Sequence, residues 1–197
     1  MKKKMNLPNK LTILRMIIVL IIIALALLPE GKSFGFWKLS YDYRMVSILV
    51  LFVIGSYTDH LDGHIARKNN LVTTFGKFMD PIADKLLVNS LFVILTGMGR
   101  IHWLVTVIMV SRDIVVDVIR LIMVERGTVI AASKWGKLKT VAQMIALIFV
   151  LALPAPDGHF INVSTDILTY IAAFISLMSG FDYFWKNRKV LLEDALS

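Results

Sequence analysis

The chain has 197 residues, of which 57% are hydrophobic, and it carries a formal net charge of +8 at pH 7. Soluble domains are usually about 45–50% apolar, so this composition, with a mean hydropathy of +0.71, argues against a soluble protein and favours one that lies in a lipid bilayer. Because the sequence contains no cysteine, disulfide bonds and thiolate metal sites are excluded.

Six apolar segments follow one another along the chain, and each approaches the roughly 20 residues that a helix needs to cross a bilayer. They lack the amphipathic periodicity that a soluble helical bundle would show. The sequence therefore predicts one all-α domain over residues 1–197, a polytopic membrane protein with six transmembrane helices. We expect these helices at 8–29, 43–68, 76–98, 102–124, 134–154 and 164–185.

The first of these segments also has features of a signal peptide. Three lysines at positions 2–4 precede an apolar run that ends in the small-residue sequence 24–26, as at a cleavage site. Pro8, Asn9 and Arg15 interrupt the approach to that run, and the rest of the chain is polytopic. We expect an uncleaved first helix.

Lysine and arginine residues are distributed unevenly between the two ends of the predicted helices. With the N-terminus in the cytoplasm, only Lys32, Lys38, Arg44 and Arg100 of the 22 fall on the outer side. This bias is typical of a multi-pass protein of the cytoplasmic membrane, whose inner leaflet is anionic. The basic residues border membrane segments and form no basic face on a soluble module, so we expect no nucleic-acid binding.

Four aspartates, Asp59, Asp62, Asp80 and Asp84, occur around the junction of the second and third predicted helices. Within each helix the two aspartates are three or four residues apart and therefore share a face. Two helices joined by a short connection run antiparallel, so the four carboxylates can converge near the inner membrane surface. Such a cluster needs a cation to neutralise it, and oxygen ligands favour Mg²⁺ or Mn²⁺.

The aspartates have two other interpretations besides a catalytic metal site. They could form ion pairs with Arg67, Lys77 and Lys85, although ionisable residues at membrane depth are costly and are usually functional. A divalent-cation transporter could use the same carboxylates to line a permeation path. That function does not require Gly63 and Ala66 at their spacing, so we prefer the metal site.

The spacing of these residues, D-x2-D-G-x2-A-R-x8-G-x3-D-x3-D, resembles the signature of the CDP-alcohol phosphotransferases. The resemblance implies a membrane enzyme with six transmembrane helices, usually dimeric, whose site opens to the cytoplasm. All eight fixed positions of the signature are matched, by Asp59, Asp62, Gly63, Ala66, Arg67, Gly76, Asp80 and Asp84.

The same resemblance implies a role for each of these residues. Asp59, Asp62 and Asp80 would hold divalent metal that grips the pyrophosphate of CDP-diacylglycerol. Asp84 would act as general base on the acceptor hydroxyl and also contact a second metal ion. The residues implied to bind the CDP moiety are Gly63, Ala66, Arg67 and Gly76.

A set of basic residues bears on the acceptor. Arg112 and Arg120 lie in the fourth predicted helix and Lys137 and Lys139 in the fifth, where they could bind a phosphate. The alternative is an internal ion pair, because Asp113, Asp117 and Arg120 share one helix face.

Within the family, the chain is similar over nearly its whole length to members that use sn-glycerol 3-phosphate. This resemblance is carried by Arg112, Arg120 and the segments 6–15, 70–73, 77–81 and 136–140. It implies phosphatidyl transfer to sn-glycerol 3-phosphate in phospholipid biosynthesis, with Arg112, Arg120 and Lys137 as ligands of the acceptor phosphate. Sister enzymes that use inositol phosphate, serine or another alcohol remain the alternative.

Four residues depart from the family pattern. His60 and His64 stand where aromatic residues are common, and we expect them to be solvated at a helix end, with a metal pair as the alternative. Asp113 replaces a common glutamate, and Asp117 adds a negative charge that would weaken phosphate binding if it pointed inward.

Overall fold

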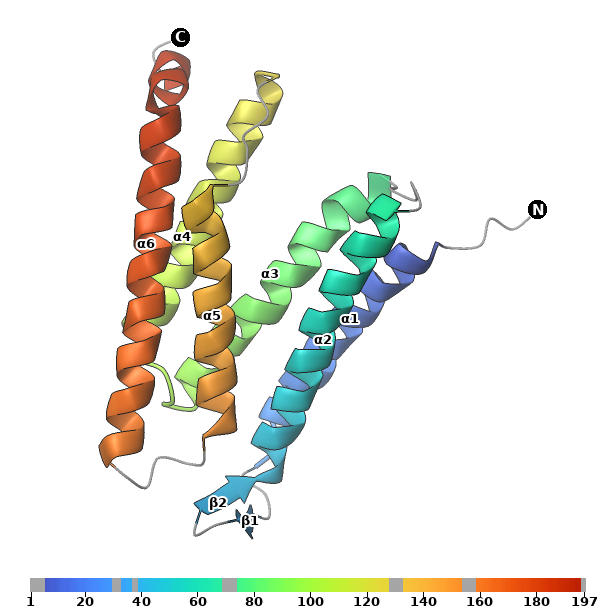
Figure 1. The fold of residues 1–197 in the computed structure, drawn as a ribbon, viewed down its shortest axis with the longest axis vertical. Helices are drawn as coiled ribbons and strands as arrows, with labels where there is room; N and C mark the ends of the chain where they lie inside the picture. Colours follow the sequence, from blue (N-terminus) through green and yellow to red (C-terminus); the bar gives the residue numbers. More distant parts are fainter. Residues whose placement is uncertain are drawn as a thin grey trace, which may run out of the picture. The chain divides into compact units, whose positions relative to one another are not determined.

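A computed structural model of the chain describes residues 6–29, 33–36, 39–68, 74–127, 133–153 and 159–195 (Figure 1). In this part the predicted all-α class is confirmed, and a short antiparallel hairpin of β1 (Ser33–Phe36) and β2 (Leu39–Asp42) is added between the first two helices. The helices are α1 (Leu7–Ala26), α2 (Tyr43–Lys68), α3 (Thr74–Gly97), α4 (Trp103–Glu125), α5 (Lys134–Ala152) and α6 (His159–Ala195).

The helix ends follow local chemistry. Pro8 lies in the first turn of α1, where a missing N–H costs nothing, and Pro29 prevents the helix from continuing beyond its last turn. After α3, Gly99 adopts a left-handed conformation with φ of 70° and donates its N–H to Thr96 O, while Arg100 N donates to Leu95 O. These two bonds form a Schellman motif, which satisfies carbonyls at the helix end.

One helix contains a proline, and another is longer than predicted. Helix α3 continues through Pro81, as its predicted range of 76–98 requires, although a proline removes one backbone hydrogen bond and often kinks a helix. Helix α6 was expected at 164–185 and extends from His159 to Ala195. Its last turns contain charged residues, so the length of the apolar segment underestimated the length of the helix.

Three helices in the described part are long and apolar enough to cross a membrane: Leu7–Ala26, Lys134–Ala152 and Val163–Arg188. Six spans were predicted. The length and apolarity of the described helices support three of them, in α1, α5 and α6, and the spans predicted in α2, α3 and α4 stay predictions. Charged residues interrupt the apolar stretches of α3 and α4, and the described side chains of α2 form a shorter apolar stretch, Tyr43–Thr58.

The chain divides into two compact units. The first comprises Met1–Ile94 with Val150–Asp157, and the second comprises Leu95–Phe149 with Gly158–Ser197. The first unit contains α1, α2, the hairpin and most of α3. The second contains α4, α6 and nearly all of α5. The prediction of a single domain over residues 1–197 stays a prediction.

In the first unit, α1 packs along α2 around a buried arginine. The Arg15 side chain is completely buried, and its Nε donates to Gly55 O at 3.3 Å. Thr58 Oγ1 donates to the same carbonyl at 2.7 Å. Because a buried polar group costs free energy unless it is hydrogen-bonded, this shared carbonyl helps to fix α1 against α2.

Gly55 also allows α3 to approach α2 closely. A Cβ atom at position 55 would come within 3.0 Å of Leu87 Cδ2, a separation that requires the leucine to move. Leu87 is itself buried, with 1% of its side chain exposed. The contact places the middle of α2 beside the middle of α3.

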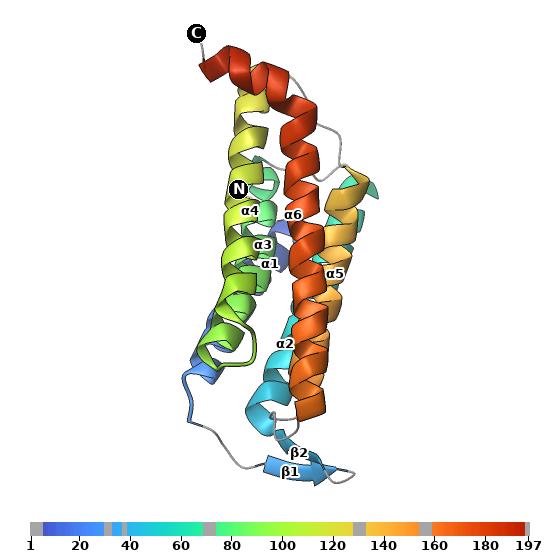
Figure 2. The ribbon, with the colours of Figure 1, turned by 90° about the vertical axis from the view of Figure 1, so that its left-hand side faces the viewer.

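In the second unit, α4 and α6 lie side by side (Figures 1 and 2). Helix α5 joins them through Gln143 Nε2, which donates to Met109 Sδ of α4 at 2.9 Å. Met109, Leu147 and Ala172 contribute apolar side chains to the interior of this unit, and none is more than 1% exposed. The polar contacts between these helices include residues that the sequence predicts to bind the acceptor phosphate.

Replacing Gly55 by leucine tests the close approach of α2 and α3. We expect Gly55→Leu to destabilise the protein by about 1–3 kcal/mol, because the larger side chain overpacks a closed interior. The measurement is thermal unfolding in detergent. Gly97→Leu is the matched control, because nothing lies within 4 Å of a Cβ atom at position 97; equal unfolding temperatures for the two variants would contradict the packing.

Candidate active site

The predicted carboxylate cluster belongs to α2 and α3 of the first unit. Asp80 and Asp84 are half-buried and lie one turn apart on α3, and Gly76 is buried one turn before Asp80. The backbone of α2 carries five further predicted site residues, but the side chains of residues 59–75 lie outside the described part of the chain. These five are Asp59, Asp62, Gly63, Ala66 and Arg67.

The helix register relates the two pairs of aspartates. Gly55 of α2 lies beside Leu87 of α3, and α2 and α3 are joined by a connection of only five residues, 69–73. In such an antiparallel pair, both helices approach the connection in step. Asp59 lies about one turn beyond Gly55 on α2, and Asp84 lies about one turn before Leu87 on α3, so both are nearer to the connection by a similar distance. The backbone positions of these two aspartates therefore lie at a similar level of the helix pair.

Thr12 of α1 contacts this site and was not predicted as a site residue. Its side chain is completely buried, and its Oγ1 donates to Asp80 Oδ1 at 2.5 Å. Pro8 O lies at 3.1 Å from the same hydroxyl and is the weaker acceptor, because it is farther away and uncharged. A hydroxyl that donates to a carboxylate fixes the orientation of that carboxylate.

The chemistry of the donors suits a hard divalent cation. Carboxylate oxygens are the ligands that Mg²⁺ and Mn²⁺ prefer, and a ligating carboxylate is usually held by a hydrogen bond of the kind that Thr12 makes. No group of three His, Asp or Glu residues suited to a metal occurs among the described side chains, which do not include Asp59 and Asp62.

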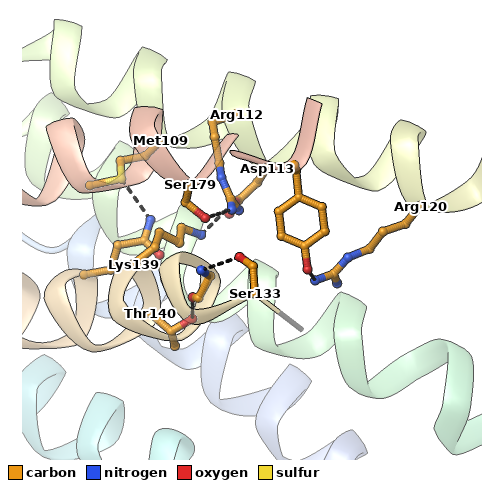
Figure 3. A network of polar contacts seen from close by, with 11 residues as sticks. Met109, Arg112, Asp113, Arg120, Ser133, Lys139, Thr140 and Ser179 are labelled. Carbon is orange, nitrogen blue, oxygen red and sulfur yellow. Dashed lines mark hydrogen bonds and ion pairs between the residues drawn. The ribbon is translucent and has the colours of Figure 1, made fainter. Parts of the chain in front are cut away.

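The second unit contains a buried ionic cluster around Asp113 (Figure 3). Asp113 Oδ1 accepts from Arg112 Nη1 at 3.0 Å and from Lys139 Nζ at 2.6 Å. All three side chains are buried, with 5–10% of their surface exposed. Arg112 also donates through Nη2 to Ser179 Oγ of α6 at 2.5 Å. One carboxylate thus neutralises part of the charge of two cations and joins α4 to α5.

Arg120 lies two turns beyond Arg112 on α4 and has a different partner. Its Nη2 donates to the Tyr183 hydroxyl at 2.9 Å, and its guanidinium carbon lies 5.3 Å from the centroid of the Tyr183 ring. The ion pairing that was the alternative interpretation of these basic residues therefore occurs for Arg112 and Lys139, whereas Arg120 is held by a tyrosine.

Two of the three lysines of α5, Lys137 and Lys139, differ in their exposure. Lys139 is buried in the cluster around Asp113, whereas Lys137, the predicted phosphate ligand, is exposed. Sequence reasoning also did not identify Ser179 and Tyr183. Their signal was a pair of polar residues four positions apart, which lie on one face of α6.

Comparison with known proteins shows the family of the chain. The family model described as CDP-alcohol phosphatidyltransferase matches residues 5–179, which is most of the chain and includes all of the residues predicted to bind metal, nucleotide or phosphate. The chain belongs to the CDP-alcohol phosphatidyltransferase family. It is therefore an enzyme of the type that the aspartate spacing predicted.

Relatives of known name are similar over almost their whole length. CDP-diacylglycerol--glycerol-3-phosphate 3-phosphatidyltransferase of Bacillus subtilis (strain 168) is 37% identical over 191 residues, covering 94% of this chain and 97% of the relative. The protein of the same name from Haemophilus influenzae is 35% identical over 195 residues, covering 97% and 98%. A third, from Rickettsia prowazekii, is 36% identical over 180 residues, covering 91% and 93%.

Removal of the shared carboxylate tests the ionic cluster. We expect Asp113→Ala to destabilise the protein by about 3–5 kcal/mol, because it leaves two buried cations without their common partner. Lys139→Met leaves the Arg112–Asp113 pair intact and is expected to cost less. Thermal unfolding in detergent measures both, and an unfolding temperature of Asp113→Ala equal to that of the wild type would contradict the cluster.

Proposed function

We propose that this chain transfers the phosphatidyl group of CDP-diacylglycerol to sn-glycerol 3-phosphate and releases CMP, in phospholipid biosynthesis. The main support is the similarity over more than nine tenths of the chain to relatives named for that reaction. The eight matched positions around the aspartates and the basic residues of α4 and α5 are consistent with it.

The cofactor of the proposed reaction is divalent metal, Mg²⁺ or Mn²⁺. Asp59, Asp62 and Asp80 would hold it, and Asp84 would contact a second ion. Bound metal compensates the charge of the phosphate oxygens. The hydrogen bond from Thr12 supports this assignment, because it orients the Asp80 carboxylate without using a cationic residue that would compete with the metal.

Asp84 is the proposed general base. Its carboxylate accepts the proton of the acceptor hydroxyl as the hydroxyl oxygen attacks the phosphorus attached to diacylglycerol. A bond forms between that oxygen and phosphorus, and the bond from phosphorus to the CMP oxygen breaks. CMP leaves with the bonding electrons, and the products are phosphatidylglycerophosphate and CMP.

Small residues would leave room for the nucleotide. Gly63, Ala66 and Gly76 would line the CDP pocket, and Arg67 would contact the CDP moiety. Gly76 is buried one turn before Asp80, which agrees with close approach of a ligand or another backbone to that part of α3.

Arg112, Arg120 and Lys137 are the proposed ligands of the acceptor phosphate. A guanidinium group has five N–H donors, so the bonds from Arg112 to Asp113 and Ser179 leave further donors for a phosphate. Arg120 and Lys137 are exposed. Lys139 donates to Asp113. We therefore assign it a supporting role in the site and do not include it among the phosphate ligands.

We further propose that all six helices span the cytoplasmic membrane, with the site facing the cytoplasm and the enzyme acting as a homodimer. Helix α4 has an exposed apolar face at Ile114, Val118 and Leu121, a spacing that follows one side of a helix. Two of its charged residues, Arg112 and Asp113, are buried on another side. Lipid can therefore contact α4 although the helix carries charges.

Turnover of the purified protein tests this function. With CDP-diacylglycerol, Mg²⁺ or Mn²⁺ and sn-glycerol 3-phosphate, we expect release of CMP, and we expect EDTA to abolish it. Asp84→Asn should lower kcat by about 100-fold or more, since it removes the general base. Asp166→Asn, at an exposed position of α6, is the matched control and should retain activity.

Three outcomes would contradict parts of the proposal. Release of CMP with serine or inositol phosphate but not with sn-glycerol 3-phosphate would overturn the acceptor. Normal turnover of Asp84→Asn would overturn the general base, and full activity in EDTA would overturn the metal requirement.

Thr12 provides a test of the metal site that does not depend on turnover. We expect Thr12→Val to weaken Mn²⁺ binding about tenfold, in the range seen when a partner of a metal ligand is removed, whereas Thr12→Ser keeps the hydroxyl and the affinity. The measurement is titration of the purified protein with Mn²⁺ followed by electron paramagnetic resonance. Equal affinities of Thr12→Val and the wild type would show that Thr12 does not support a metal ligand.

A further inference from the structure

Helix α6 presents two buried polar residues to the arginines of α4. Ser179 is completely buried and Tyr183 is 2% exposed, and they lie one turn apart. Buried polar side chains require hydrogen-bond partners, and each of these two finds an arginine: Ser179 contacts Arg112 and Tyr183 contacts Arg120. None of the metal or nucleotide residues proposed above lies on α6.

Arg112 is confined by this face of α6 along most of its length. A Cβ atom at Gly180 would come within 3.0 Å of Arg112 Cγ and 3.8 Å of Arg112 Nε, so the arginine stem lies directly against the α6 backbone. At its end, Ser179 contacts Nη2 and Asp113 contacts Nη1. The plane of the guanidinium group is thereby determined by two partners.

Arg120 is an exposed residue whose side chain would otherwise sample many rotamers, and ordering such a side chain costs conformational entropy. Tyr183 provides both a hydrogen bond at 2.9 Å and the face of its ring, 5.3 Å from the guanidinium carbon. The latter geometry is that of a cation–π contact. Together they hold Arg120 in one orientation.

The same face of α6 also adjoins the start of α5. A Cβ atom at Gly136 would lie 3.7 Å from Tyr183 Cε2 and 3.9 Å from Ser179 Oγ. Gly136 immediately precedes Lys137, the third proposed phosphate ligand. Ser179 and Tyr183 are thus in contact with, or next to, every element that carries a proposed ligand of the acceptor phosphate.

We propose that Ser179 and Tyr183 are positioning residues for the acceptor phosphate: Ser179 holds Arg112 and Tyr183 holds Arg120 in place before the acceptor binds. This inference rests on the proposed function and adds α6 to the elements that form the acceptor site. Ligands held in place before binding lose less conformational freedom when they bind. The two residues therefore contribute to acceptor affinity and leave binding of CDP-diacylglycerol unchanged.

The test is to measure KM for sn-glycerol 3-phosphate and KM for CDP-diacylglycerol separately in variants of Ser179 and Tyr183. We expect Tyr183→Phe, which keeps the ring and removes the hydroxyl, to raise KM for sn-glycerol 3-phosphate about tenfold, the order expected for a hydrogen bond to a charged group. KM for CDP-diacylglycerol and kcat should stay within about twofold of the wild type. Ser179→Ala should show the same split. Loss of the ring as well, in Tyr183→Leu, should raise the acceptor KM further.

Two matched controls are available on α6. Tyr170→Phe removes the hydroxyl of an exposed tyrosine that contacts the ring of His102, and Ser176→Ala removes a buried hydroxyl that has no hydrogen-bond partner among the described residues. Both should leave the acceptor KM unchanged. Equal increases of both KM values in Tyr183→Phe, or an unchanged acceptor KM, would overturn the proposal.

A double-mutant cycle shows whether Tyr183 acts through Arg120. If it does, Arg120→Ala and the Arg120→Ala, Tyr183→Phe double variant have the same acceptor KM, whereas independent effects multiply and would overturn the assignment. A wrong acceptor in the proposed function would be recognised separately. The wild-type enzyme would then release CMP with another acceptor and not with sn-glycerol 3-phosphate. The KM split is then measured with that acceptor, and its absence in Tyr183→Phe overturns the positioning role.

Discussion

A single carboxylate, that of Asp113, holds the second unit together. It accepts from Arg112 and from Lys139, and through Arg112 it is connected to Ser179 of α6. Ionic groups buried in an apolar protein must be paired, because the cost of removing each from water exceeds what it recovers alone. Helices α4, α5 and α6 are therefore joined where their charged and polar residues meet, and the packing that satisfies these charges also determines the direction of Arg112.

In the first unit, two buried polar residues of α1 contact the neighbouring helices. Arg15 is buried and donates to the carbonyl of Gly55, while Thr12, one turn earlier on α1, donates to Asp80 of α3. Two polar residues on one face of α1 thus contact the two helices that carry the aspartates. In a chain with so many apolar residues, such contacts are the specific ones, because lipid and apolar side chains favour many helix arrangements almost equally.

Much of the fold was predictable because its causes are local. The helices lie within a few residues of their predicted bounds at most ends, because an apolar segment of about 20 residues is itself the condition for a span, and Pro29 and Gly99 limit two of them. The hairpin was not predicted, since Trp37 and Lys38 between its strands are not among the residue pairs typical of tight turns. The sequence prediction ended α6 at residue 185 because it followed the apolar segment, and the helix continues to Ala195 through polar and charged residues.

The sequence by itself determined the family, the pairs of aspartates on α2 and α3 and the presence of basic residues on α4 and α5, because the spacing of residues along a helix decides which of them share a face. Only the tertiary structure determined which residues these side chains contact. Lys137 and Lys139 are two residues apart and so project about 200° from one another around α5, and only the packing of α5 against α4 determines that Lys139 meets Asp113. In the same way, the partners of Thr12, Ser179 and Tyr183 lie more than 60 residues away in the chain, where no local rule of spacing applies.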